Sequence, residues 1–160
     1  MTNFDKKELE KLIGFETEKI EFNLPLEPKA LKRHRTSFRN GKMFNYDPST
    51  KDKNKIKLLS AQYMPDEPFE NEIYLYIKFY MKRPKSHYGT GKNSNIIKSS
   101  APETHIKKPD LSNMIKLIED SFNGMFYKDD SQINHLTAVK EYTDIDPFIY
   151  ICIVNRKNFN

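Results

Sequence analysis

Residues 107–142 read KKPDLSNMIKLIEDSFNGMFYKDDSQINHLTAVKEY. Apolar residues recur at helical spacing in the first half, and Asn123-Gly124 follows with a glycine where helices commonly end. We predict a helix over Leu111–Phe122 whose apolar face consists of Leu111, Ile115, Ile118 and Phe122. The imperfect alternation over Gln132–Tyr142 predicts a strand. A helix followed by a strand is therefore the unit around which the fold is built.

The flanking sequence supplies the other elements. The clearest strand is Glu72–Met81 (EIYLYIKFYM), which is almost entirely β-branched or aromatic and should be central in its sheet. We also expect strands at Lys19–Leu26 and Phe148–Val154, a helix over Pro48–Met64 with Ile56, Leu59 and Tyr63 inward, and a hairpin tip at Arg39–Tyr46 turning at Asn40-Gly41. Residues 84–104 read as a long mobile loop. The pattern predicts an α+β domain, a small mixed sheet packed with helices, over 19–160. A helix over 5–19 makes residues 1–18 an N-terminal helical extension.

Length and composition exclude several classes of protein. A chain of 160 residues with 37% hydrophobic residues suits one domain with a real core. No apolar run approaches the ~20 residues of a membrane helix, and the first residues do not resemble a signal peptide. The single cysteine, Cys152, excludes an internal disulfide and a multi-thiolate zinc site. We therefore expect a cytoplasmic protein without a membrane partner.

The charges are segregated along the chain. Residues 29–57 hold ten Lys or Arg and two Asp, and residues 78–108 hold eight Lys or Arg and one Glu. Residues 109–160 instead hold eight acids and five bases. A basic surface beside carboxylates is typical of a metal-dependent nuclease, because bases hold phosphates and acids hold a cation. The alternative is a solvated, lysine-rich surface without special function.

The predicted helix carries a polar stripe that could perform chemistry. Asp110, Asn113 and Lys116 follow one another at a spacing of three, and Asp120 continues the line. Asp129-Asp130 comes one short connection later, and if that connection folds back, Asp110 and one of the pair could share a cation. Hard oxygen ligands select Mg²⁺ or Mn²⁺. The alternatives are that Asp110 only caps the helix, that Lys116 and Asp120 form a surface ion pair, and that the Asp pair is a turn.

The same segment resembles a known family. The matching residues are Lys108-Pro109-Asp110, Asn113, Lys116, Asp120, Asn123-Gly124, Asp129-Asp130-Ser131-Gln132 and Lys140-Glu141-Tyr142. In these residues the chain is similar to the RusA-type endodeoxyribonucleases, which resolve Holliday junctions and are frequent in phages and prophages. The resemblance covers roughly residues 20–155, since Tyr46-Asp47-Pro48 ahead of a helix fits it too.

The resemblance implies a function and roles for individual residues. Asp110 and Asp130 would bind Mg²⁺, or Mn²⁺, with Asp129 as a further contributor, and Lys116 would be the catalytic lysine. Asn113 would orient Asp110. The partner would be branched double-stranded DNA, and a homodimer would resolve four-way junctions by paired symmetric nicks.

One position departs from the family pattern. The chain has Ser112 where the family usually has a second aspartate, and a serine hydroxyl is a poorer ligand for magnesium than a carboxylate. Three consequences are open: a weakened or inactive member that only binds branched DNA, a variant disabled for trapping DNA, or compensation by Asp129 or Glu119. Ser112 and Asn113 thus both belong to the surroundings of the metal site.

Basic residues outside the helix are expected to hold the DNA backbone. These are Lys32, Arg33, Arg35, Lys107, Lys108 and Lys140, each of which could equally be a solvated base. Phe38, Phe44 and Tyr46 interleave with bases and could either wedge into the centre of a junction or pack a hairpin; packing is the favoured interpretation. A basic α+β domain of another kind, such as an RNA-binding one, is the third hypothesis.

Overall fold

The computed structural model describes residues 17–156 and confirms an α+β fold with a mixed sheet. The spatial order of the four strands is β1 (Thr17–Leu24), β6 (Phe148–Arg156), β4 (Glu72–Lys82) and β5 (Ile133–Thr143). β6 pairs antiparallel with both β1 and β4, whereas β4 and β5 are parallel. The parallel pair requires a crossover, and the crossover contains the segment with the polar stripe.

The central position of β4 is confirmed. Its side chains alternate, and Ile73, Leu75, Ile77 and Phe79 are buried on one face with at most 1% of their surface exposed. A strand hydrogen-bonded on both sides and buried on one face needs the β-branched and aromatic residues found here.

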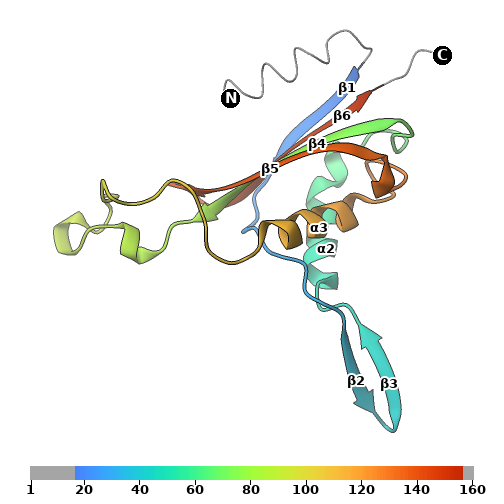
Figure 1. Cartoon of the computed structure of the whole chain (residues 1–160), viewed down its shortest axis with the longest axis horizontal. Helices are drawn as coiled ribbons and strands as arrows, with labels where there is room; N and C mark the ends of the chain where they lie inside the picture. Colours follow the sequence, from blue (N-terminus) through green and yellow to red (C-terminus); the bar gives the residue numbers. More distant parts are fainter. Residues whose placement is uncertain (1–16, 157–160) are drawn as a thin grey trace.

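Two helices cover the apolar face of the sheet, α2 (Thr50–Ser60) and α3 (Leu111–Phe122), as Figure 1 shows. The bounds of α3 are as predicted, and all four residues of the predicted apolar face contact the core, but the buried face is wider than predicted and includes Met114 and Leu117. The buried residues are Met114, Leu117, Ile118, Ser121 and Phe122. Leu111 and Ile115 are only partly buried. Ser121 is polar, so the sequence pattern did not place it on the buried face. Its burial is tolerated because its hydroxyl donates a 2.6 Å hydrogen bond to the Leu117 carbonyl.

Helix α2 is shorter than the predicted Pro48–Met64. It begins at Thr50, and the short 3₁₀ helix η1 (Ala61–Tyr63) follows its end. Ile56 is buried and Leu59 packs against the core, as expected. Tyr63 keeps 36% of its surface exposed, but its ring stacks on that of the buried Phe22 at 4.5 Å, so it also faces inward. The Ser49 hydroxyl does not cap the helix, since it accepts a 2.8 Å hydrogen bond from the Lys32 backbone N–H.

The predicted turn at Asn40-Gly41 joins β2 (Arg35–Arg39) to β3 (Lys42–Tyr46). Both turn residues have positive φ, 52° and 70°, which Asn and Gly tolerate. The hairpin projects away from the sheet, beyond the two helices (Figure 1).

Boundaries near the N-terminus differ from the prediction. Most of the expected helix over 5–19 lies outside the described residues, but Thr17–Lys19 already belong to β1, so the predicted end of that helix is wrong. β1 ends at Leu24 rather than Leu26 because Pro25 has no N–H to donate. No helix within residues 17–156 has the length and apolar character needed to cross a membrane.

The segment between β4 and α3 has local structure of its own. It contains the 3₁₀ turns η2 (Lys85–His87) and η3 (Gly91–Asn93). Arg83 ties it to the sheet by bonding Asp144 at 2.6 Å and the Pro102 carbonyl at 2.7 Å.

Candidate functional site

Asp110 stands immediately before α3 with an uncommitted carboxylate. Its backbone is extended, and its carbonyl accepts hydrogen bonds from the N–H groups of Asn113 (3.1 Å) and Met114 (3.2 Å). Its side chain is exposed and forms no cap hydrogen bond. The interpretation of Asp110 as a side-chain cap is therefore wrong, and the carboxylate is free to bind a ligand at the positive end of the helix dipole.

The polar side of α3 is organised differently from the expected single line. Ser112 and Lys116 are exposed. Asp120 does not pair with Lys116, because its carboxylate accepts a 2.7 Å hydrogen bond from Lys53 of α2. The predicted Lys116–Asp120 ion pair is wrong, and Lys116 presents its ammonium to solvent within electrostatic range of Glu119. Asn113 makes no side-chain hydrogen bond to Asp110 among the described residues, so its orienting role stays a prediction.

Lys53 is an organising residue that the sequence pattern did not reveal. Its ammonium lies 2.7 Å from the Asp120 carboxylate and 2.8 Å from that of Asp47, which follows β3. Partial burial lowers the pKa of Lys53, but bonds to Asp120 and Asp47 outweigh this effect and leave the pKa raised. One charge thus ties the hairpin base, α2 and α3 together.

Asp129 and Asp130 have separate functions despite being neighbours. The Asp129 carboxylate accepts a 2.9 Å hydrogen bond from the Ser131 N–H and caps the 3₁₀ turn η4 (Asp130–Gln132), while the Gln132 side chain bonds the Asp129 N–H at 2.8 Å. These bonds from Ser131 hold the pKa of Asp129 below its usual value. The turn interpretation is correct for Asp129, whereas the Asp130 carboxylate forms no hydrogen bond or ion pair within residues 17–156.

Asp130 lies beside the C-terminal part of α3. Burial raises the pKa of the Glu119 carboxyl, and the nearby charges of Asp130 and Asp120 raise it further. Asp130 acts in the same direction on the buried hydroxyl of Tyr127, which donates a 3.3 Å hydrogen bond to the Glu119 carbonyl. Burial is thus the main cause of the raised pKa of Glu119, and the charge of Asp130 adds to it.

Lys140 marks the opposite end of the helix. Its ammonium donates 2.6 Å hydrogen bonds to the carbonyls of Lys107 and Pro109, just ahead of α3. The structure thus gives Lys140 an anchoring contact, and its expected phosphate contact stays a prediction. Lys107 and Lys108 are exposed next to it.

Asp110 and Asp130 do not come together within one chain. A helix of twelve residues is about 18 Å long, and the eight residues from Ile133 to Lys140 span roughly 23 Å of strand. Lys140 contacts the start of α3, whereas Asp130 lies near its end. The connection between α3 and β5 therefore does not bring Asp130 back to Asp110 at the helix start, as the shared site would require. Within residues 17–156 no three His, Cys, Asp or Glu side chains are grouped so that they could hold a metal ion.

The expected DNA-contacting bases Lys32, Arg33 and Arg35 are exposed on the approach to the hairpin and its first strand. None of them is neutralised by an ion pair among the described residues. They form a positive stretch leading away from α3, which suits a phosphate backbone.

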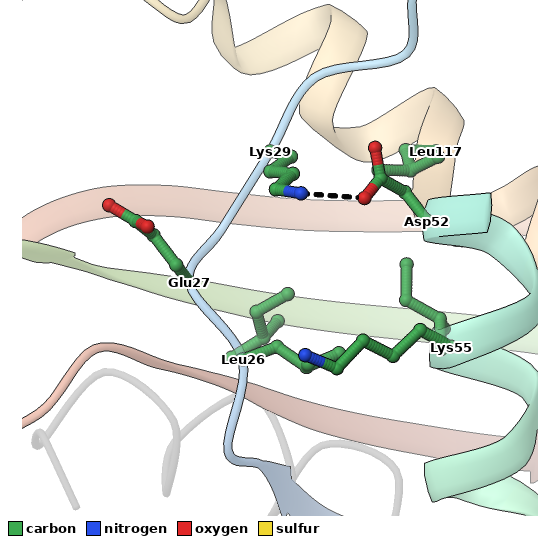
Figure 2. A pocket seen from close by; sticks show the side chains of 8 residues that line it. Leu26, Glu27, Lys29, Asp52, Lys55 and Leu117 are labelled. Carbon is green, nitrogen blue, oxygen red and sulfur yellow. Dashed lines mark hydrogen bonds and ion pairs between the residues drawn. The ribbon is translucent and has the colours of Figure 1, made fainter. Parts of the chain in front are cut away.

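A cavity of about 190 Å³ lies between α2 and the segment after β1. Figure 2 shows Lys29 and Asp52 joined across it by a 2.7 Å ion pair, with Glu27 and Lys55 at its sides. None of the residues predicted for the site lines this cavity. The candidate site residues Asp110, Lys116 and Asp130 are exposed on or beside α3, as suits a bulky substrate.

Two comparisons with known proteins identify the family of the chain. Residues 25–154 match the family model described as endodeoxyribonuclease RusA. The chain is also 32% identical over 139 residues to "Uncharacterized protein YqaN" of Bacillus subtilis (strain 168), an alignment covering 84% of this chain and 94% of that protein. The matched span includes the hairpin, both helices and the acids at each end of α3. The chain belongs to the RusA endodeoxyribonuclease family, whose members are junction-resolving endonucleases.

Proposed function

We propose that this family member is a Mg²⁺- or Mn²⁺-dependent endonuclease that acts as a homodimer and resolves four-way DNA junctions by paired symmetric nicks. The observation that carries the proposal is the family match over residues 25–154, which contains Asp110, Lys116 and Asp130 with side chains that are not engaged in the fold. A cytoplasmic location follows as part of the same proposal, because that is where such a DNA substrate is found.

The separation of the two acids argues for a composite site. Asp110 and Asp130 lie at opposite ends of α3, too far apart for one ion in one chain. A two-fold dimer offers a solution, since each protomer has an unused acid at both ends of this helix. We therefore place Asp110 and Lys116 of one protomer together with the partner's Asp130. This arrangement makes dimerisation a requirement for cleavage.

The donor set fits a divalent cation. Asp110 and Asp130 offer hard carboxylate oxygens that form no hydrogen bond or ion pair with other side chains among the described residues. A bound cation would supply Lewis-acid polarisation of the phosphate and a more acidic bound water. Glu119 lies roughly 10 Å along the helix from Ser112, so it cannot compensate for Ser112 in its own chain. In the composite site the partner's Glu119 accompanies the partner's Asp130 and supplies the missing carboxylate.

Lys116 is placed to assist the chemistry. Hydrolysis adds a water oxygen to the scissile phosphorus and expels one bridging oxygen, so negative charge builds on the phosphate. An exposed ammonium on α3 stabilises that charge by a charge-assisted hydrogen bond. Asp110, at the helix start, is oriented by its own backbone bonds to Asn113 and Met114.

The test is cleavage of an end-labelled four-way junction with Mg²⁺. We expect paired nicks at symmetric positions, and a loss of at least a hundredfold in rate for Asp130→Asn with junction binding retained. Asp146→Asn, at an exposed acid in the turn before β6, is the matched control and should cleave like the unaltered protein.

Two outcomes would contradict the proposal. Equal binding to branched and linear DNA would remove the junction as substrate. Tight junction binding without nicks would identify a non-catalytic member, and Ser112→Asp should then switch cleavage on.

A further inference from the structure

The β2–β3 hairpin exposes an unusual amount of apolar surface. Every residue of both strands is exposed. Phe38 keeps 77% of its surface accessible, Met43 63%, Phe44 50% and Tyr46 46%. Cross-strand packing within the hairpin is compatible with this exposure, but the rest of the described fold does not bury these side chains. A lone two-stranded hairpin is marginally stable in water, so such a composition indicates a partner.

The strand register separates the hairpin into two faces. Arg35, Ser37 and Arg39 pair with Tyr46, Phe44 and Lys42, so bases and aromatic rings alternate on one face. The other face carries the Phe38–Met43 pair next to the turn. Behind this pair the Thr36 hydroxyl bonds the Asn45 side chain at 2.7 Å. The tip is thus apolar on one face and cationic on the other.

The charge of the hairpin decides what kind of partner fits. Residues 29–46 contain six Lys or Arg and no Asp or Glu. Lys29 pairs with Asp52, but Arg35, Arg39 and Lys42 form no ion pair within residues 17–156. A cationic face beside exposed aromatic rings is complementary to a nucleic acid whose bases are accessible, because phosphates meet the cations and bases stack on the rings.

Both ends of the hairpin are fixed to the helices. On the incoming side the Leu31 N–H donates to the Asn113 carbonyl of α3 at 2.8 Å, and the Lys32 N–H donates to the Ser49 hydroxyl. On the outgoing side Asp47 is held by Lys53, which also holds Asp120. The base of the hairpin is therefore held by hydrogen bonds and ion pairs to the two helices, one of which carries Lys116.

We infer that the hairpin is the element that recognises the branch point: Phe38 and Met43 stack against unpaired bases at the centre of the junction, while Arg35, Arg39 and Lys42 contact the flanking phosphates. This inference rests on the proposed function, because it takes branched DNA as the ligand. It adds to that function that the β2–β3 hairpin is the element by which the protein distinguishes branched from linear DNA.

The test uses the full chain and a four-way junction with 2-aminopurine at the branch point. Binding of the unaltered protein should raise the fluorescence as the base unstacks. Phe38→Ala with Met43→Ala should abolish this rise and weaken junction binding roughly tenfold, with binding to linear duplex unchanged. Leu58→Ala on α2 is the matched control, since Leu58 is 76% exposed but lies outside the hairpin. Arg39→Ala with Lys42→Ala should weaken binding to all DNA and reduce the salt-dependence slope by about 2.

The outcomes separate this inference from the proposed function. If the unaltered protein binds and nicks junctions and the Phe38/Met43 variant matches it in affinity and fluorescence, the inference is wrong and the function stands. If the unaltered protein has no preference for junctions, the function itself fails. A change in oligomeric mass for the Phe38/Met43 variant, measured by sedimentation, would assign the hairpin to protein–protein contact and overturn the inference. All altered side chains are exposed, and thermal melts confirm that each variant is folded.

Discussion

Adjacent acids in this protein have opposite energetic effects. Asp120 accepts a hydrogen bond from Lys53 and joins two helices, whereas its neighbour Glu119 is partly buried with a raised pKa. In the same way Asp129 caps a turn while Asp130 keeps an uncommitted carboxylate. A carboxylate that costs stability in a fold is a frequent sign of a functional position.

The Glu119 environment leads to a stability prediction. Since the pKa of Glu119 is raised in the folded protein, its ionised form is penalised above the unfolded-state pKa, near 4.5, and the penalty disappears below it. Glu119→Gln should therefore raise the melting temperature at pH 7.5 and leave it unchanged at pH 4. If Glu119 also serves the composite site, the same variant should cleave junctions more slowly.

Asp120→Asn is the matched comparison at the neighbouring position. It removes the negative charge that pairs with Lys53 and should lower the free energy of unfolding by roughly 0.5–1 kcal/mol at pH 7.5. A lower melting temperature for both variants would show that Glu119 is stabilising and that its proposed crowding by Asp130 is wrong.

At the scale of elements, the hydrophobic pattern predicted which helices and strands form better than it predicted which of their faces are buried. The bounds of α3, the central place of β4 and the turn at Asn40-Gly41 follow from local sequence. The predicted face of α3 was incomplete, because Met114, Leu117 and the polar Ser121 are also buried. The exposure of the hairpin was also missed, since apolar composition alone does not distinguish a packed hairpin from a binding one.

The segment between β4 and α3 should respond to pH. His87 and His105 both lie 4.7 Å, centre to centre, from the ring of Tyr142 in β5. Burial lowers the pKa of each histidine, and Arg83 adds to the effect at His87 and Lys140 at His105. The neutral rings therefore fit the fold, and protonation works against these contacts.

A histidine with a lowered folded-state pKa costs nothing above pH 6.5 and destabilises as the pH falls below that value. Hydrogen-exchange protection factors for residues 84–106 should drop between pH 7.5 and pH 5.5. The double variant His87→Gln and His105→Gln cannot gain these charges, so its protection should not change with pH. An equal drop in that variant would assign the pH response to other groups.

At the scale of the whole molecule, the sequence suggested which polar residues to consider for the site, but it did not predict how they are arranged in space. Spacing along α3 identifies which polar residues share a helix face. It does not predict where the loop after α3 places Asp130 in space. The Gln132 side chain decides this by bonding the Phe69 and Asn71 carbonyls ahead of β4, which fixes Asp130 near the end of α3. Residue spacing along one chain does not predict contacts between distant segments. It does not predict what a second subunit contributes either.

The composite site makes a prediction that a single-chain site does not. In a mixed dimer of Asp110→Asn and Asp130→Asn protomers, one site carries both substitutions and the other carries neither, provided that each site takes Asp110 from one protomer and Asp130 from its partner. If each site were built within one protomer, both sites of the mixed dimer would be damaged.

The most direct measurement is therefore junction cleavage by this mixed dimer, co-expressed with two different affinity tags and purified through both. We predict that each single-variant homodimer binds but does not cut, and that the mixed dimer nicks one strand of each junction without the paired second nick. A mixed dimer that binds junctions as tightly as the unaltered protein and makes no nick would contradict the composite site.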